Sequence, residues 1–497
     1  MPEREVKLEA PPRFTLPDLQ EVSDLKPGEA TTLRLRTTYW DTPDLRLARW
    51  GVSLRRRTGE PGGAVWTVKL PGSSQGRMLV RPEHEFRGGS GQPPAGALDL
   101  LRAYVRAAEL APVATLEARR RLLPLLGEDG ATRLEVSDDV VSVLEGKRVA
   151  LRFREIEVEA REGATSDSVD AVVDRLRAAG AGDPQAGSKQ ARALGPRASA
   201  PAEVSLGDIA PGHPAGDVAR RAIAASTIRL LRHDAGVRLG GDIEDVHQAR
   251  VATRRLRSDL RTFRHLLDEE WTNTTRAELG WIAGLLGAVR DADVLLERLD
   301  GALAETGQST AGKTLRRKLV AEQTSARASL LEAIRTDRYV DLLERLVTAA
   351  REPPLTESAE EPAVALAEVA ARPWNRLKKA RRELDHEPSD ADLHALRLRA
   401  KRARYAAEAV APVFGRQAEA FAGAVAGLQG VLGDLHDAAV MRDWLEAHVR
   451  GLGQRAAFAA GAVAELERQH LVADRVRWRD AWAKIGKGRQ TEWMKSA

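Results

Sequence analysis

The first strand-like segment of the chain carries charges on alternate residues. In EREVKLE, single residues separate Glu3, Glu5 and Lys7, and Val6 and Leu8 occupy the intervening positions. Because successive side chains of a β-strand point to opposite faces, the three charges share one face and the two apolar residues share the other. The spacing therefore predicts a strand with one charged face and one apolar face.

A later segment repeats this pattern with carboxylates alone. In REIEVEA, Glu155, Glu157 and Glu159 fall on one face of a predicted strand, about 7 Å from each neighbour. Three such charges repel one another unless cations neutralise them. Hard divalent ions such as Mg²⁺ or Mn²⁺ prefer oxygen ligands of this kind, so these ions are the expected cofactors.

Basic residues occur at strand-like spacing between these two segments. They are Arg34, Arg36, Arg55, Arg57, Lys69, Arg81, Arg119 and Arg121. Arg binds phosphate oxygens bidentately and Lys acts as a point charge. A closed sheet with acids and cations facing inward would offer the layout that triphosphate chemistry needs. Alternating charges also fit the solvated outer face of a half-buried sheet, and the spacing does not choose between the two.

Composition limits the kind of protein that carries these residues. The 497 residues exceed one ordinary core, and 43% hydrophobic content is typical of globular domains. With no cysteine, disulfides and thiolate metal sites are excluded. The net charge is only +5, so a polyanion site must come from local clustering. No signal-like or membrane-spanning run is visible, and we expect a cytoplasmic protein without membrane association.

The chain divides into two parts with different patterns. Up to about residue 160, short alternating segments separated by Gly- and Pro-rich turns predict six or more strands, interrupted by two helical windows. After a linker-like stretch, apolar spacing becomes three and four, which indicates helices. We therefore expect an α+β multidomain protein with a β barrel or tunnel, followed by an all-α domain. The expected limits are 1–196, a linker at 197–213, and 214–497.

The helical part contains an internal repeat. VHQARVATRRLR begins at Val246 and LHALRLRAKRAR begins at Leu393, and downstream LLGAVRDADV matches VLGDLHDAAV. Two copies of one helical bundle are the natural interpretation. The expected halves are residues 214–350 and 363–497.

Each copy of the repeat places a basic stripe beside an apolar helix face. The stripes are His247, Arg250, Arg254 and Arg257 in the first copy, and His394, Arg397, Lys401 and Arg404 in the second. Like charges along one helix face cost stability. Repeating that cost at matched positions favours a polyanion ligand, although a single Arg-rich face is often only solvated.

Two other ligands for the stripes are weighed against a phosphate polymer. Nucleic acid also suits an Arg stripe, but base-stacking aromatic residues are sparse in the helical part, which counts against it. A zinc site lacks cysteine ligands and any H-x-x-x-H pair.

Six segments, in order, resemble the motifs of the CYTH superfamily, the triphosphate tunnel metalloenzymes. They are the opening E-x-E-x-K, YWDTPDLRLARWGVSLRRR, WTVKLPG, RPEHEF, REIEVEA and SKQARAL, the last with Ser188 and Lys189. The resemblance covers residues 1 to about 196. It implies an eight-stranded antiparallel tunnel that binds a linear triphosphate with a divalent metal.

The resemblance also implies roles for individual residues. The metal ligands would be Glu3, Glu5, Glu157 and Glu159, with Glu155 as a substitute and Asp138 or, in our assignment, Asp139 joining them. The phosphate-binding residues would be Lys7, Arg55, Arg57, Lys69, Arg81 and Arg119, to which the spacing adds Arg34, Arg36 and Arg121. The catalytic groups would be Lys7, Glu5 and Glu157. Which of Arg119, Arg120 and Arg121 faces inward depends on strand parity and is left open.

HQARVATRRLR and HALRLRAKRAR resemble the CHAD domain, the conserved-histidine α-helical domain. This resemblance runs from about Pro214 to the end. It implies two four-helix bundles whose basic stripes face each other across a groove that binds inorganic polyphosphate. The eight stripe residues are the implied contacts, and Arg255, Arg402, Arg290 and His436 are weaker candidates.

Together, the two resemblances predict an inorganic triphosphatase tunnel joined to a polyphosphate-binding domain, with recruitment to polyphosphate granules as a consequence. Related tunnel enzymes act on thiamine triphosphate or RNA ends, or cyclise ATP. Thiamine triphosphatase and class IV adenylate cyclase activities are therefore alternatives. A further alternative is a protein that holds polyphosphate without turnover.

Overall fold

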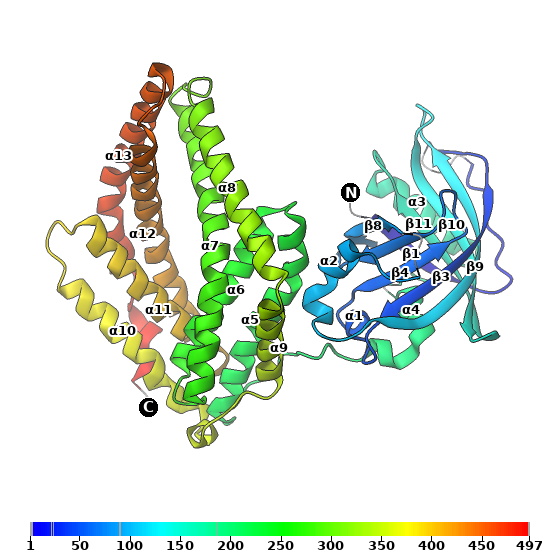
Figure 1. Ribbon diagram of the computed structural model, residues 1–497. Coiled ribbons are helices and arrows are strands. Elements are labelled where there is room, and N and C mark those ends of the chain that lie inside the picture. Colours follow the sequence, from blue (N-terminus) through cyan, green and yellow to red (C-terminus); the bar gives the residue numbers. More distant parts are fainter. Residues whose placement is uncertain (1–2, 21, 23, 89–90, 186, 496–497) are drawn as a thin grey trace. The chain divides into compact units, whose positions relative to one another are not determined.

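The computed structural model describes residues 3–20, 22, 24–88, 91–185 and 187–495. The chain forms two compact units, Met1–Glu203 and Val204–Ala497, and each is described by itself (Figure 1). The first unit is built on a sheet and the second is helical, which confirms the predicted fold class. The finer domain limits proposed from the sequence remain predictions.

The first unit contains one large antiparallel sheet. Its order is β6-β7-β1-β11-β10-β9-β3-β4-β5-β8, and β2 pairs with β9. The strands are β1 (Glu3–Ala10), β2 (Lys26–Pro27), β3 (Thr31–Asp41), β4 (Ser53–Thr58), β5 (Val65–Lys69), β6 (Ser73–Gln75), β7 (Met78–Arg81), β8 (Glu83–Arg87), β9 (Ala111–Leu126), β10 (Thr132–Glu145) and β11 (Arg148–Ala160).

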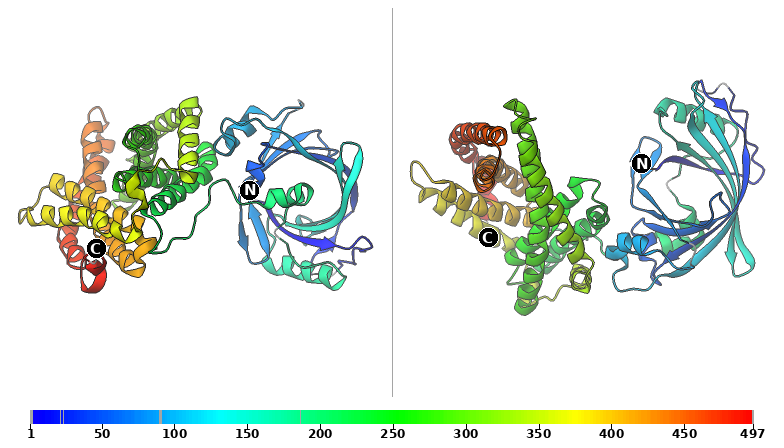
Figure 2. Two further views of the ribbon diagram at one scale, coloured as in Figure 1. Left: turned by 90° about the horizontal axis from the view of Figure 1, so that it is seen from below. Right: turned by 45° about the horizontal axis from the view of Figure 1, so that its top comes forward.

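The two edges of this sheet are joined by the chain itself. Strands β7 and β8 are consecutive, with Pro82 between them; β7 pairs with β1, and β8 pairs with β5. Proline lacks the N–H that a ladder needs, so it marks the point where the segment changes partner. If β7 and β8 are counted as one strand and the short β2 and β6 are set aside, eight strands curl around an interior, as predicted (Figure 2).

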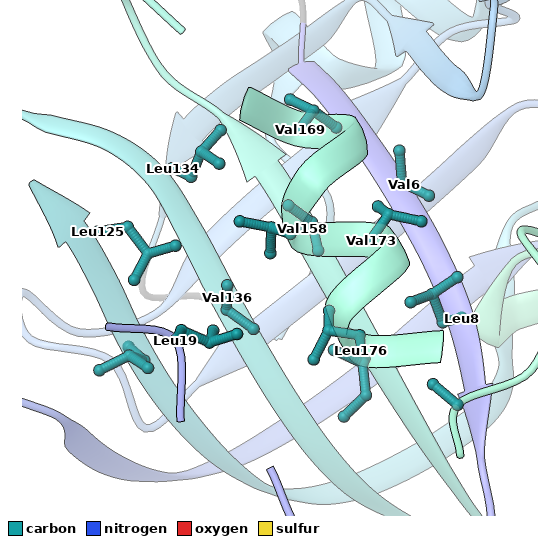
Figure 3. Packing of buried hydrophobic residues seen from close by; sticks show 14 of the residues in the cluster. Val6, Leu8, Leu19, Leu125, Leu134, Val136, Val158, Val169, Val173 and Leu176 are labelled. Carbon is teal, nitrogen blue, oxygen red and sulfur yellow. The ribbon is translucent and has the colours of Figure 1, made fainter. Parts of the chain in front are cut away.

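The outer face of the sheet is apolar where helix α3 (Ser166–Ala178) covers it. Val6 and Leu8 of β1 are buried against this helix together with Val158 of β11 (Figure 3). Each such side chain stabilises the fold by roughly 1.5–3 kcal/mol. Since the apolar residues occupy the outer face, strand alternation sends the charged residues of β1 and β11 inward.

Three further helices belong to the first unit. They are α1 (Arg46–Arg49), α2 (Ala95–Val105) and α4 (Lys189–Leu194). Ser188 is the N-cap of α4, where its hydroxyl accepts a hydrogen bond from the Ala191 N–H. This cap fixes the start of the helix and, with it, the position of Lys189.

The second unit consists of helices that repeat along the chain. The first half contains α5 (Ala215–Leu239), α6 (Ile243–Thr262), α7 (Glu269–Glu305), α8 (Lys313–Ile334) and α9 (Asp337–Arg351). The second half contains α10 (Leu366–Arg382), α11 (Asp390–Phe414), α12 (Arg416–His448) and α13 (Gln454–Ala483). The four-helix repeat is present, and α9 is an addition in the first half. None of the helices within the described residues has the length and hydropathy needed to cross a bilayer.

The two halves share part of their core. Leu303 of α7 and Leu319 of α8 lie in one buried cluster with Met441 and Trp444 of α12 and Val463 of α13. The two repeats therefore pack against each other through their long hairpins, rather than standing as separate bundles.

Candidate functional site

The interior of the sheet holds a cavity of about 760 Å³. Eight residues predicted from the sequence line it, namely Glu3, Lys7, Arg55, Arg57, Lys69, Arg81, Glu157 and Glu159. Further lining residues are Arg4, Tyr39, Ser53, Glu60, Glu83, Glu85, Arg120, Glu135, Arg161, Ser188 and Lys189. The charged faces of β1 and β11 thus belong to one interior site.

Lys189 joins three of the predicted metal ligands. Its ammonium lies 2.7 Å from Glu157, 2.8 Å from Glu155 and 3.0 Å from Asp139. Burial alone would lower the pKa of Lys189, but these three carboxylates outweigh burial and raise it. Lys189, Lys7 and Arg120 together hold the pKa of Glu157 well below its ordinary value against the effect of burial, whereas burial raises the pKa of Glu155.

Lys7 occupies the inner face of β1, as predicted. Its ammonium lies 2.9 Å from Glu5 and 3.7 Å from Glu157, and the pKa of Lys7 is raised because these acids outweigh burial. Glu5 is only 3% exposed and lies in the wall beneath the cavity. The three predicted catalytic groups are therefore connected through one ammonium group.

Arg120 is the inward residue of β9, and the choice of Arg119 and Arg121 was wrong. Arg120 donates to Asp139 at 2.8 and 2.7 Å and to Glu157 at 3.0 Å, whereas Arg119 and Arg121 are exposed. Arg120 lies directly opposite Asp139 in the ladder, so the two side chains share a face. Only this register fixes which of three consecutive arginines enters the cavity.

The structure also places Arg34 and Arg36 outside the cavity. Both are exposed, and Arg36 pairs with Glu117 at 2.9 Å on the outer face. The side chains of β3 that point inward are instead those of residues such as Leu35 and Tyr39, which are buried. The prediction followed the charges, but the apolar residues of β3 take the inner face.

Arg57 of β4 lies close to both Arg55 and Arg120 inside the cavity. Arg57 has a lowered pKa because of burial and of repulsion from Arg55 and Arg120, which a single 2.7 Å bond to Glu60 only partly offsets. Among the described residues, the buried Nε atoms of Arg55 and Arg57 have no hydrogen-bond partner. Crowded guanidinium groups with unused donors are suited to a phosphate-like anion.

The remaining predicted cations hold the seam where β7 meets β8. The Lys69 ammonium lies 2.6 Å from Glu3 and 3.2 Å from Glu83, linking β5 to β1. Arg81 donates to the backbone carbonyls of Leu70 at 3.2 Å and Gly51 at 2.6 Å. Arg81 therefore fixes the backbone at the cavity wall with two of its donors.

Carboxylates gather at another part of the cavity. The pKa of Glu159 is raised to about 7, mainly by burial and also by Glu3, Glu135 and Glu5, while Arg161 opposes them. In the ladder, Glu5 lies opposite Glu159, which lies opposite Glu135. Within the described residues, no three of these groups yet converge closely enough to hold an ion. Their oxygen atoms suit a hard divalent cation, and at present each carboxylate is paired with a cation: Glu3 with Lys69, Glu5 with Lys7, and both Glu135 and Glu159 with Arg161.

In the second unit, the two predicted stripes meet where α6 and α11 approach each other. Arg250 and Arg254 of α6 repel Arg397 and Lys401 of α11, and Arg254 donates to the Tyr405 hydroxyl at 2.7 Å. Burial and the neighbouring Arg254, Arg397 and Arg250 lower the pKa of Lys401 to about 7. We call these four cations the central groove cluster.

The histidines lie beside this cluster. The rings of His394 and His436 are 4.3 Å apart, and their Nδ1 atoms are separated by 3.2 Å. Burial lowers the pKa of His247, with further lowering from Arg290 and Arg250. The weaker candidates Arg290 and His436 therefore do lie near the stripes.

Arg257 and Arg404, at the far end of each stripe, lie in other surroundings. Arg404 pairs with Glu408 at 3.0 Å. Arg257 lies near Arg261 and Arg276 instead. The structure therefore brings together the first three members of each stripe and not the last.

Sequence reasoning did not assign several interior residues to the site, and two of them, Arg120 and Lys189, contact Glu157 directly. Arg120 was left open among three arginines, and Lys189 was noted only as part of a Ser-Lys segment. The signal for Lys189 was the N-cap serine before it, since a cap fixes the direction of the helix that follows. Choosing Arg120 among the three arginines would have required the register of β9 against β10.

Comparison with known proteins identifies two domains. Residues 1–186 match the family described as the CYTH domain, and residues 221–446 match the CHAD domain. The uncharacterized proteins MT2285 and Rv2226 of Mycobacterium tuberculosis are each 33% identical to this chain over 442 residues. The aligned region covers 84% of this chain and 82% of each relative.

Solved structures are similar to parts of the chain. PptA from Streptomyces chartreusis is 28% identical, with a TM-score of 0.47, and covers 54% of this chain and 99% of its own. The CHAD domain from the plant Ricinus communis is 22% identical, with a TM-score of 0.46. The match covers 57% of this chain and 96% of that domain. The putative adenylyl cyclase HpAC1 from Hippeastrum, reported to have a dominant triphosphatase activity, is 16% identical, with a TM-score of 0.27. The match covers 38% of this chain and 94% of that protein. TM-scores this low carry no argument. The domain matches and the relatives show the family: this chain belongs to the proteins that join a CYTH domain to a CHAD domain.

Proposed function

We propose that the CYTH unit hydrolyses inorganic triphosphate, or a related short phosphate chain, with Mg²⁺ or Mn²⁺. The observation that carries this proposal is the crowding of Arg55, Arg57 and Arg120 in one cavity with the carboxylate-rich region around Glu159. Repulsion of Arg57 by Arg55 and Arg120 is relieved by a bound polyanion. Repulsion among the carboxylates is relieved by a divalent cation.

The residues of the cavity divide the work of binding and proton handling. The guanidinium groups of Arg55 and Arg57, which line the cavity, bind phosphate oxygens, and Lys7 neutralises charge that develops on the reacting phosphoryl group. Glu157 stays ionised because of its cationic neighbours, so it accepts a hydrogen bond from the attacking water and orients it. Glu3, Glu5 and Glu159 would hold the divalent cation, which supplies charge neutralisation and a water of lowered pKa when bound.

The CHAD unit, in this proposal, holds inorganic polyphosphate along the central groove cluster. Four cations from α6 and α11 lie together there at matched positions of the repeat. The energetic cost of that arrangement is offset when phosphate groups bind between them. Contacts of this kind weaken with salt, and they would recruit the protein to polyphosphate deposits in the cytoplasm.

A second candidate function is polyphosphate holding without turnover. It is favoured by the pairing of Lys189 with Asp139, Glu155 and Glu157, which leaves these predicted metal ligands already neutralised. Under this alternative, the tunnel binds phosphate chains and releases them unchanged.

Orthophosphate release separates the two functions. We expect release from triphosphate with Mg²⁺ or Mn²⁺, and less from thiamine triphosphate, ATP and long polyphosphate. Arg57→Gln should slow release strongly, whereas the exposed outer-face control Arg36→Gln should not. Absence of release from every substrate with both metals would favour the holding function. Formation of cyclic AMP from ATP would instead favour a cyclase.

A further inference from the structure

A second basic site lies in the helical unit, away from the central groove cluster. It is a pocket of about 260 Å³ between α6, α10 and α11. Six arginines line it, namely Arg261, Arg264, Arg372, Arg376, Arg399 and Arg402. We call it the cationic pocket. It shares no lining residue with the central groove cluster.

The arginines of this pocket are uncompensated. Within the described part of the chain, none of the six forms an ion pair with a carboxylate. The neighbours that act on Arg261 are Arg276, Arg402 and Arg257, and together with burial they lower its pKa. His265 also lines the pocket, and the acid that acts on it is Glu361. The pocket therefore concentrates positive charge without a protein counterion for its guanidinium groups.

The internal repeat supplies a matched pocket for comparison. The alignment that sets His247 against His394 also sets Arg255 against Arg402, and Arg261 against Glu408. A pocket of about 420 Å³ between α5, α6 and α11 is lined by Arg255, Arg404 and Glu408, and its Val218 and Arg221 repeat the spacing of Val369 and Arg372. The two pockets are therefore equivalent positions of the repeat.

The matched pocket neutralises its own charge, and the cationic pocket does not. Glu408 pairs with Arg255, and with Arg404 at 3.0 Å, and Arg255 also lies 3.1 Å from Asp259. At the equivalent positions of the cationic pocket, Arg402 faces Arg261. One copy of the repeat thus carries an ion pair where the other carries two like charges. The six arginines of the cationic pocket are exposed, and their like charges favour binding of an external anion there.

The form of the pocket limits the ligand. Its volume lies just below the roughly 300–1,000 Å³ range of small-molecule sites, which suits a compact anion. Six guanidinium groups, each able to bind two oxygens, match linked phosphate groups better than a single carboxylate. Val369 and Pro373 add an apolar surface beside the cations.

We propose that the cationic pocket binds a compact anion that carries two or three linked phosphate groups, independently of the central groove cluster. The phosphate groups come from an inorganic oligophosphate or from a phosphorylated small molecule. This site goes beyond the proposed triphosphatase and polyphosphate functions, and it does not depend on either.

Site-resolved protection of arginines tests the proposal on the full chain. The protein is treated with phenylglyoxal, which modifies arginine, and modification is mapped by mass spectrometry. Inorganic pyrophosphate should slow modification of Arg372, Arg376 and Arg402 by about tenfold, as several charge-assisted contacts predict. Adenosine diphosphate distinguishes the two sources of phosphate. If adenosine diphosphate also protects these arginines, organic phosphates enter the pocket. If only pyrophosphate protects them, the pocket is restricted to inorganic phosphates. Failure of both anions to protect would overturn the proposal.

A charge-swap variant tests the asymmetry directly. Arg261→Glu sets a carboxylate against Arg402, as Glu408 is set against Arg255, so the matched pocket already shows that this pair is tolerated. Pyrophosphate protection should disappear in Arg261→Glu and persist in Arg450→Glu, an equal charge change in an exposed turn. If Arg261→Glu fails to fold, Arg372→Gln should give a weaker loss in the same direction. Unchanged protection in both pocket variants contradicts the proposal.

The central groove cluster provides the control for independence. Lys401→Gln should weaken retention of long-chain polyphosphate and leave pyrophosphate protection in the cationic pocket intact. Loss of pocket protection in Lys401→Gln would show one continuous site and would overturn this inference. If no groove variant loses polyphosphate retention, only the groove proposal is overturned.

Discussion

The Lys189 ammonium lies 2.7 Å from the Glu157 carboxylate, and the same ammonium contacts Glu155 and Asp139. One ammonium group from α4 therefore contacts three carboxylates from β10 and β11, which Arg120 and Lys7 also help to neutralise. Removing one member of such a buried cluster leaves charge without a partner, and the cost is larger than the strength of any one ion pair suggests.

Lys189→Gln should destabilise the protein by about 3–5 kcal/mol at pH 7. Because the pKa of Lys189 is raised in the folded state, Lys189 stays protonated at pH 7 and below, so its own titration adds no pH dependence there. Without it the pKa of Glu157 rises, so the deficit should shrink as acid protonates the cluster. Urea unfolding at pH 7 and pH 5 measures this. Lys379→Gln, which removes an exposed ammonium 3.7 Å from Glu383, should change stability by less than about 1 kcal/mol. A deficit that grows on acidification would contradict the assignment.

Glu159→Gln should stabilise the metal-free protein at high pH. The pKa of Glu159 is about 7 in the folded state, so the folded protein binds more protons than the unfolded chain between about pH 4.5 and 7. Stability therefore falls as pH rises through that window, and the ionised form is the unfavourable one. The variant should gain roughly 1–3 kcal/mol at pH 8 and nothing below pH 4.5.

The response to metal provides the control for Glu159. Wild-type protein should gain thermal stability with Mn²⁺ at pH 8, because a bound cation offsets the ionised carboxylate. Glu159→Gln should gain much less. Equal gains in both proteins would show that the ion binds elsewhere.

The charged faces of β1 and β11 could be predicted because apolar residues alternate with the charges in both strands. Val6 and Val158 have to pack under α3, and this requirement alone sends Glu5 and Glu157 inward. In β3 and β9 that logic fails. Leu35 takes the interior beside the cavity, and consecutive arginines in β9 carry no alternation at all.

The missing information was the register between strands. Asp139 lies opposite Arg120, and a shift of one residue would have turned Arg119 or Arg121 inward. Single-sequence patterns do not contain that pairing. The same limit applies to Lys189, whose role depends on where α4 begins against β10 and β11.

Arg120→Gln and Arg119→Gln form a matched pair that tests this register. Arg120 bonds to Asp139 and Glu157 inside the cavity, whereas Arg119 is exposed. Loss of the inward guanidinium should lower the rate of triphosphate hydrolysis by about a hundredfold, as removal of a buried charge-stabilising donor does. Loss of the outward one should change the rate by less than about twofold. Equal effects would mean that neither arginine contacts the phosphate chain.

Lys401 should make polyphosphate binding depend on pH near neutrality. In the free protein its pKa is lowered to about 7, first by burial and then by Arg254 and Arg397. A bound polyanion favours the ammonium form and raises that pKa, so binding takes up a proton. Affinity should therefore fall as pH rises from 6 to 9, by up to about tenfold per unit. Fluorescence anisotropy of labelled polyphosphate at constant ionic strength measures this.

Substitution at the same position isolates the cause of that pH dependence. Lys401→Arg keeps a positive charge that does not titrate in this range, so it should bind polyphosphate with little pH dependence. Lys401→Gln should bind weakly at every pH and also lack the slope. Burial lowers the pKa values of His247, His394 and His436, so in the free protein these histidines carry less charge at neutral pH than exposed histidines do. If Lys401→Arg keeps the wild-type slope, the titrating group lies elsewhere in the groove.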